Sequence, residues 1–104
     1  MTVGEWLRAR TPEAPDRLRA RVDAVLGPRR DEDAAATPDM CLDAACGLLD
    51  DLLGRPSAGR ESALDLLTVD ALVTYAFEAA SDQPADLGDR AVTAMRRLGA
   101  TVRE

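Results

Sequence analysis

Proline and glycine divide this chain into four stretches that are each long enough to form a helix. Gly27-Pro28 follow the first stretch, Gly54 and Pro56 follow the second, and Pro84 stands at the start of the fourth. Both residue types interrupt helices, because proline lacks a backbone N–H and glycine adopts the conformation that ends a helix. Between these breaks apolar residues recur every three or four positions, as on a helix with one buried face. The chain is therefore predicted to be all-α.

The breaks and the capping residues also set the expected helix boundaries. The predicted helices run from about residue 15 to 26, from 37 to 53, from 57 to about 80, and from 84 to 98. Thr37 and Ser57 are the expected caps of the second and third helices, and Asp82-Gln83-Pro84 caps the fourth. Gly99 is expected to end the fourth helix.

The remaining segments complete the expected architecture. Residues 1–10 are predicted to form a short helical turn or to fray, and residues 101–104 a tail. Residues 27–37 lack any period and are expected to form a flexible loop. Because the other connections are short, neighbouring helices are expected to be antiparallel. We therefore expect one domain over 1–104, an antiparallel four-helix bundle with a short N-terminal helical segment.

Composition excludes several kinds of chemistry. The chain is 46% hydrophobic but only 3% aromatic, and it contains no Lys, Ile, Asn or His. The first three have AT-rich codons, so their absence indicates a GC-rich, bacterial genome. Without histidine there is no Ser-His-Asp triad, no Cys-His pair and no histidine metal ligand. We expect no cofactor and no metal, and we lean against an enzyme.

Charge and hydropathy indicate the expected location and partners. The net charge of −6 disfavours nucleic acid, because affinity for phosphates depends on positive charge. No apolar run approaches the ~20 residues of a membrane span, and the N-terminus lacks a signal-peptide pattern. A cytoplasmic protein is expected. Cys41 and Cys46 lie ~140° apart around one helix, so we expect two free, buried thiols rather than a disulfide.

Carboxylates allow one enzymatic alternative. All-α nucleotide pyrophosphohydrolases of the MazG-like group have a similar architecture, with Glu-Glu-x-x-Glu on one helix and Glu-x-x-Asp on the next. In this chain Asp50 and Asp51 stand near the end of the second helix, with no glutamate in residues 42–51. Glu61 and Asp65 on the third helix are four residues apart instead of three. A magnesium-dependent pyrophosphohydrolase-like activity is the second alternative, and these departures count against it.

The first alternative is a small-molecule site inside the bundle. Asp70 stands among apolar residues in the middle of the third helix, and an unpaired buried carboxylate would cost several kcal/mol. Asp70 must therefore be paired, protonated or exposed. With Thr74 and Tyr75 it would form the polar part of an otherwise apolar pocket.

The preferred hypothesis is a non-catalytic helical interaction protein that binds itself or another protein. The third helix is apolar on almost every side, which is typical of a central helix or of one partly covered by a second subunit. A homodimer is the simplest form of this hypothesis, since two-fold dimers are the commonest assemblies. The expected partner-binding residues are apolar positions on the N-terminal segment and third helix with two arginines of the first helix: Trp6, Leu7, Leu72, Phe77, Arg17 and Arg21.

Overall fold

The computed structural model shows an all-helical chain, as the sequence predicts. It describes residues 1–55, 59–82 and 87–103. The helices are α1 (Val3–Arg10), α2 (Asp16–Leu26), α3 (Thr37–Leu53), α4 (Arg60–Ser81) and α5 (Leu87–Arg103), with two short 3₁₀ turns, η1 (Gly27–Asp31) and η2 (Ala34–Ala36). No strand occurs in these described ranges apart from an isolated bridge between Thr2 and Asp33. The antiparallel four-helix arrangement stays a prediction.

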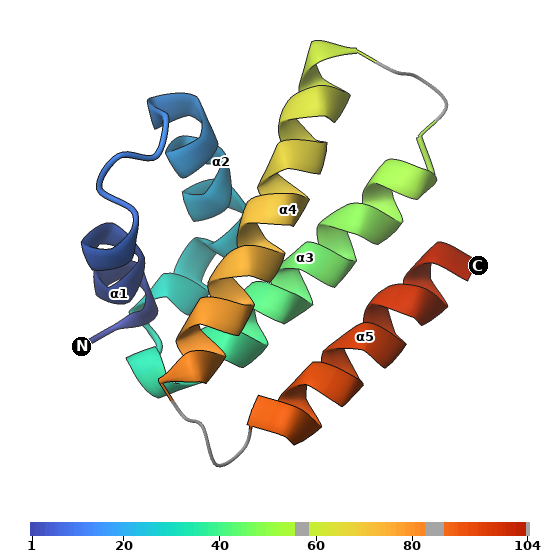
Figure 1. The fold of residues 1–104 in the computed structure, drawn as a ribbon. Coiled ribbons are helices and arrows are strands. Elements are labelled where there is room, and N and C mark those ends of the chain that lie inside the picture. The colour runs from blue at the N-terminus through green and yellow to red at the C-terminus, as the bar shows by residue number, and fades with distance from the viewer. Residues whose placement is uncertain (56–58, 83–86, 104) are drawn as a thin grey trace.

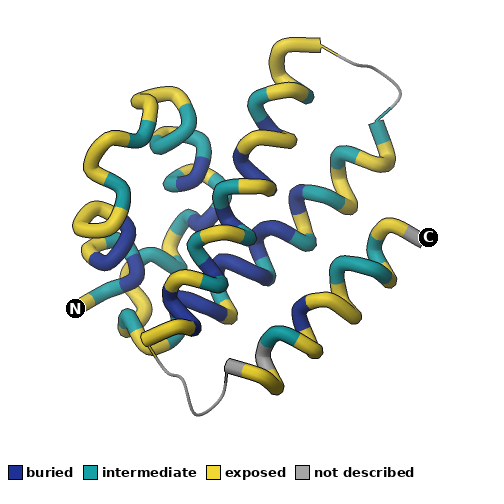
Figure 2. The backbone as a smooth tube through the Cα atoms, viewed as in Figure 1, coloured by how far each residue is buried: buried dark blue, intermediate teal, exposed yellow. Residues whose placement is uncertain are grey.

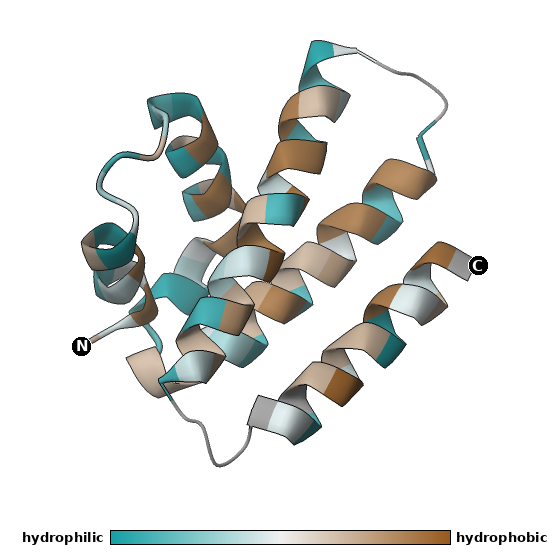
Figure 3. Ribbon diagram, viewed as in Figure 1, coloured by the Kyte–Doolittle hydropathy of each residue, from teal (hydrophilic) through white to brown (hydrophobic). Residues whose placement is uncertain are grey.

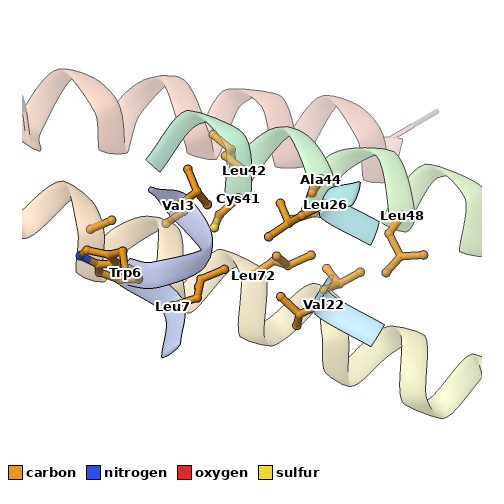
Figure 4. Packing of buried hydrophobic residues seen from close by; sticks show 14 of the residues in the cluster. Val3, Trp6, Leu7, Val22, Leu26, Cys41, Leu42, Ala44, Leu48 and Leu72 are labelled. Carbon is orange, nitrogen blue, oxygen red and sulfur yellow. The ribbon is translucent and has the colours of Figure 1, made fainter. Parts of the chain in front are cut away.

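α3 and α4 form the centre of the molecule. They share the most extensive contact between any two helices, with α1 and α2 on one side and α5 beside α3 on the other (Figure 1). The buried segments gather on α3, α4 and the inner turns of α1 and α2, whereas α5 is mostly exposed or half-buried (Figure 2). Figure 4 shows side chains from the first four helices meeting in one core: Val3, Trp6, Leu7, Val22, Leu26, Cys41, Leu42, Ala44, Leu48 and Leu72.

The N-terminal segment is a capped, buried helix rather than a frayed turn. The Thr2 hydroxyl accepts a hydrogen bond from the Glu5 backbone N–H at 3.2 Å, and the Glu5 carboxylate accepts one from the Thr2 N–H at 2.9 Å. This reciprocal pair is a capping box, which satisfies two backbone donors that a helix start leaves unpaired. Val3, Trp6 and Leu7 then point into the core, and their burial holds α1 in place.

Residues 27–37, the expected flexible loop, contain short helical turns in this structure. The segment forms η1 and η2 and pairs with the start of the chain. The Val3 N–H donates to the Glu32 carbonyl, and the Ala34 N–H donates to the Met1 carbonyl, each at 2.8 Å. These contacts join residues about thirty positions apart, so a reading of local periodicity could not detect them.

The helix ends agree with the sequence prediction at some positions and differ at others. Gly27 ends α2 with a φ of 55°, the left-handed conformation that glycine favours. Thr37 is the first residue of α3 rather than its cap, and its buried hydroxyl has no hydrogen-bond partner among the described residues. Gly99 does not end α5, which continues to Arg103 through the expected tail. Ser57, Gln83 and Pro84 lie outside the described residues, while Asp82 caps the C-terminal end of α4.

Glycine substitutions test these assignments. A methyl group added at Gly47 or Gly99 meets no atom within 4 Å. Both positions lie inside helices, so Gly47→Ala and Gly99→Ala should each raise the free energy of unfolding by up to ~1 kcal/mol. Gly27→Ala should lower it, because alanine is strained at a φ of 55°. Urea unfolding followed by circular dichroism measures all three; a destabilised Gly99→Ala variant would contradict a continuous α5.

Candidate functional site

An apolar groove lies between α5 and the α3–α4 pair. Its volume is about 320 Å³, and Leu42, Ala76, Phe77, Ala80 and Ala94 supply its apolar surface. The polar lining consists of Asp39, Asp89, Thr93 and Arg97, with Pro38 completing the wall. The groove therefore combines an apolar floor with charged groups of both signs at its edge.

α5 closes this groove with only part of its apolar surface. Among its described side chains Ala94 alone is buried, and Arg97 anchors the helix through an ion pair with Asp43 of α3 at 2.6 Å. Val92, Met95 and Val102 are 52%, 65% and 63% exposed. Large apolar side chains this exposed on one helix mark a surface that another molecule can cover.

Two further large apolar side chains are exposed, one at the end of α3 and one near the start of α4. Leu53, the last residue of α3, is 56% exposed, and Leu66 in the second turn of α4 is 59% exposed. Figure 3 shows apolar segments at this end of α3, in the first turns of α4 and along α5. Asp43 and Asp50 are two helical turns apart, so the acidic face that α5 contacts at Asp43 continues to the exposed Asp50.

The charges of α3 and α5 are opposite. The sequence of α3 contains four aspartates and no basic residue, whereas that of α5 contains four arginines and one aspartate. The Arg97–Asp43 pair is one place where the two helices already use this difference. Asp50 and Arg96 are both exposed, and neither has an ion-pair partner within the described part of the chain.

Three of the expected partner-binding residues lie in the core instead. Trp6, Leu7 and Leu72 are 6%, 5% and 0% exposed, which leaves them no surface for a partner. The Trp6 indole N–H donates to the Asp82 carboxylate at 3.2 Å and the Arg10 guanidinium lies over its ring, so Trp6 joins α1 to the end of α4. Phe77 is half-buried and lines the groove, and its partner-binding role stays a prediction. The large apolar side chains of α4 that are exposed are Leu66 and Leu67.

The two expected arginines lie beside a buried carboxylate. Arg21 Nε donates to Asp65 Oδ1 at 2.6 Å, and Arg55 Nη1 donates to Asp65 Oδ2 at 2.9 Å. The Asp65 side chain is 6% exposed, and its hydrogen bonds with Arg21 and then Arg55 lower its pKa from the ordinary value against the effect of burial. Arg55 also pairs with Asp51, and Arg17 lines the same open cleft. Arg55 follows a helix end and belongs to no sequence pattern, so periodicity does not identify it.

The structure does not bring the three expected ligand-binding residues into one pocket. Asp70 is exposed, which resolves how its charge is accommodated, and Thr74 is also exposed. The Thr74 hydroxyl donates to the Asp70 backbone carbonyl within the helix. Tyr75 faces another side of α4, where it lines a separate small cavity with Leu7 and Arg19. Among the described residues these three side chains form no shared site.

The carboxylates of the enzymatic alternative are not grouped as metal ligands. Asp65 and Asp51 are engaged by arginines, while Asp50 and Glu61 are exposed. Within the described ranges no group of three acidic or cysteine side chains is placed to hold a metal ion. The expected magnesium ligands are therefore not assembled in this structure.

The comparisons with known proteins provide no further assignment. No model of a protein family, no curated protein and no solved structure matches the chain. None of the described helices has the length and apolar character needed to cross a membrane.

Asp65→Asn should destabilise the fold by roughly 2 kcal/mol at pH 7, because two guanidinium groups would lose their charged acceptor. The matched control is Asp70→Asn on the exposed side of the same helix, expected within about 0.5 kcal/mol of wild type.

The pKa of Asp65 is lowered in the folded state. Above a pH of about 3.9, the pKa of Asp65 in the unfolded chain, the carboxylate therefore contributes to the free energy of unfolding. This contribution is lost as the pH falls through the lower pKa of Asp65 in the folded protein. Urea unfolding between pH 2 and 7 should show the wild-type and Asp65→Asn stabilities converging in acid.

The cysteines should react slowly with thiol reagents. Burial raises the pKa of Cys41 to about 12 and also raises the pKa of Cys46. Because the thiolate is the reactive form, Cys41 should stay unmodified by Ellman's reagent at pH 8 until the protein unfolds. Cys46 is less buried and should react first. Single Cys41→Ala and Cys46→Ala variants assign each reaction; fast labelling of Cys41 in the native state would contradict its placement.

Proposed function

We propose that this chain is a non-catalytic interaction module that binds a second copy of itself. The observation that carries the proposal is the uncovered apolar surface of α5, with Met95 65% exposed and Val92 and Val102 more than half exposed. A helix whose apolar side extends well beyond what its own chain covers favours burial against another helix. The four longer helices are proposed to pack antiparallel and thereby to hold α5 with its apolar side outward.

Charge favours a second copy over an unrelated partner. The chain carries both halves of a complementary contact: an arginine-rich α5 and an aspartate-rich α3 whose last turn exposes Leu53. In a two-fold dimer each copy supplies both halves, so the contact forms twice. The outer side of α5 in one copy would then cover Leu53 and Leu66 of the other, with Arg96 near Asp50. Within one copy, the Arg97–Asp43 ion pair already joins α5 to α3 by the same kind of contact.

The expected setting stays the cytoplasm of a bacterium. This part of the proposal is supported by the amino-acid usage and by the two cysteines, which are free thiols in the structure.

Native mass spectrometry and sedimentation velocity test the proposal with the full chain. The wild type should be a dimer, and Met95→Arg or Leu53→Asp should weaken the dimer at least about tenfold, since each removes apolar burial of ~2 kcal/mol per copy. Leu67→Asp is the matched control: Leu67 is 56% exposed, but it lies about 100° around α4 from Leu66. The control should stay dimeric. A wild type that is monomeric at high concentration would overturn self-association.

A charge exchange tests the proposed register. Arg96→Glu and Asp50→Arg should each weaken the dimer, and the double variant should recover part of the loss, because the pair is restored with reversed signs. Circular dichroism should show both single variants folded, as both side chains are exposed. Additive losses in the double variant would contradict the Arg96–Asp50 contact.

A further inference from the structure

A polar cleft lies on a different part of the molecule, between α2 and the beginning of α4. It has a volume of about 560 Å³ and is lined by three arginines, two acids and one leucine: Arg17, Arg21, Arg55, Glu61, Leu64 and Asp65. The lining thus carries an excess of one positive charge, with Asp51 pairing with Arg55 outside it. No role in the proposed dimer is assigned to these residues.

Asp65 holds two of the three arginines at the wall of the cleft. Its carboxylate is nearly buried and accepts from Arg21 Nε at 2.6 Å and from Arg55 Nη1 at 2.9 Å. Both carboxylate oxygens are therefore occupied, and two flexible side chains are fixed before any ligand arrives. Such preorganisation lowers the entropy lost when a ligand binds.

The fixed arginines keep unused hydrogen-bond donors. A guanidinium group has five N–H donors in a planar fork. Arg21 donates to Asp65 through Nε and Nη2, and Arg55 donates to Asp65 and Asp51 through Nη1 and Nη2, so Arg21 Nη1 and Arg55 Nε make no hydrogen bond to the described residues. Arg17 has no ion-pair partner in the described ranges and stands one helical turn before Arg21 on α2. Donors exceed acceptors in this cleft.

We propose that this cleft binds a small organic oxyanion. Its charged end, a phosphate or a carboxylate, would accept hydrogen bonds from Arg17 and from the unused donors of Arg21 and Arg55. Planar guanidinium groups match both kinds of oxyanion in a bidentate geometry. The cleft is larger than a bare phosphate requires, and Leu64 gives an apolar side for the organic part of the ligand. Glu61 opposes the anion from the first turn of α4.

Isothermal titration with inorganic phosphate and with succinate tests the site, with sodium chloride at matched ionic strength as the reference. Wild-type protein should bind one of the two oxyanions above the chloride background. Stronger binding of phosphate assigns a phosphorylated ligand, and stronger binding of succinate assigns a polycarboxylate. Equal heats for phosphate, succinate and chloride would overturn the proposal.

Variants separate a binding role from a structural role. Arg17→Gln should weaken binding about tenfold or more without changing the unfolding midpoint, because Arg17 is exposed and unpaired within the described chain. Arg8→Gln, an exposed arginine of α1, is the matched control and should bind as the wild type does. Glu61→Gln should bind more tightly, because it removes the opposing charge. Unchanged affinity in Arg17→Gln would overturn the assignment, and the readout is independent of oligomeric state.

Discussion

The fold depends on the close packing of α3 against α4. With only 3% aromatic residues, the chain has few bulky side chains to fill a wide space between its central helices. It uses small side chains instead, and those buried at the centre include Cys41, Ala44, Ala45, Ala76 and Ala79. Small residues allow two helices to approach closely, which increases the dispersion contacts of the larger side chains beside them. Leu72, with no exposed surface, benefits from this arrangement.

Local patterns in the sequence predict the helices, but they do not predict how the chain returns on itself. The Gly27 end of α2 and the start of α3 depend on conformational preferences of a few residues, so the sequence is sufficient for them. The η1–η2 segment forms hydrogen bonds with Met1 and Val3, a contact that has no local signature. α5 continues past Gly99 because the packing of Ala94 and Leu98 stabilises the helix. This stabilisation outweighs the modest free-energy cost of one glycine inside a helix.

The candidate sites likewise combine local features that the sequence predicts with long-range contacts that it does not predict. Periodicity identifies which residues of a helix are apolar, but it cannot say how much of that apolar surface the neighbouring helices cover. Met95 and Ala94 belong to the same apolar stripe of α5, yet Ala94 is buried and Met95 is 65% exposed. Likewise, the arginines of α2 are visible in the sequence, whereas their engagement by Asp65 depends on a contact between residues 44 positions apart. The position of Arg55 beside that carboxylate has no signal in the sequence.

Opposite charge on α3 and α5 aligns the two helices, but it does not by itself hold α5 in place. The Arg97–Asp43 pair aligns the helix, but both side chains are about two-fifths exposed, and an ion pair so accessible to water contributes little to stability. Burial must therefore provide most of the attachment, and α5 buries only a narrow edge of its apolar surface. A second copy that covers Met95 would add the missing burial to α5 itself. If the proposed dimer forms, its dissociation and the loosening of α5 would therefore be linked, because the same apolar surface contributes to both.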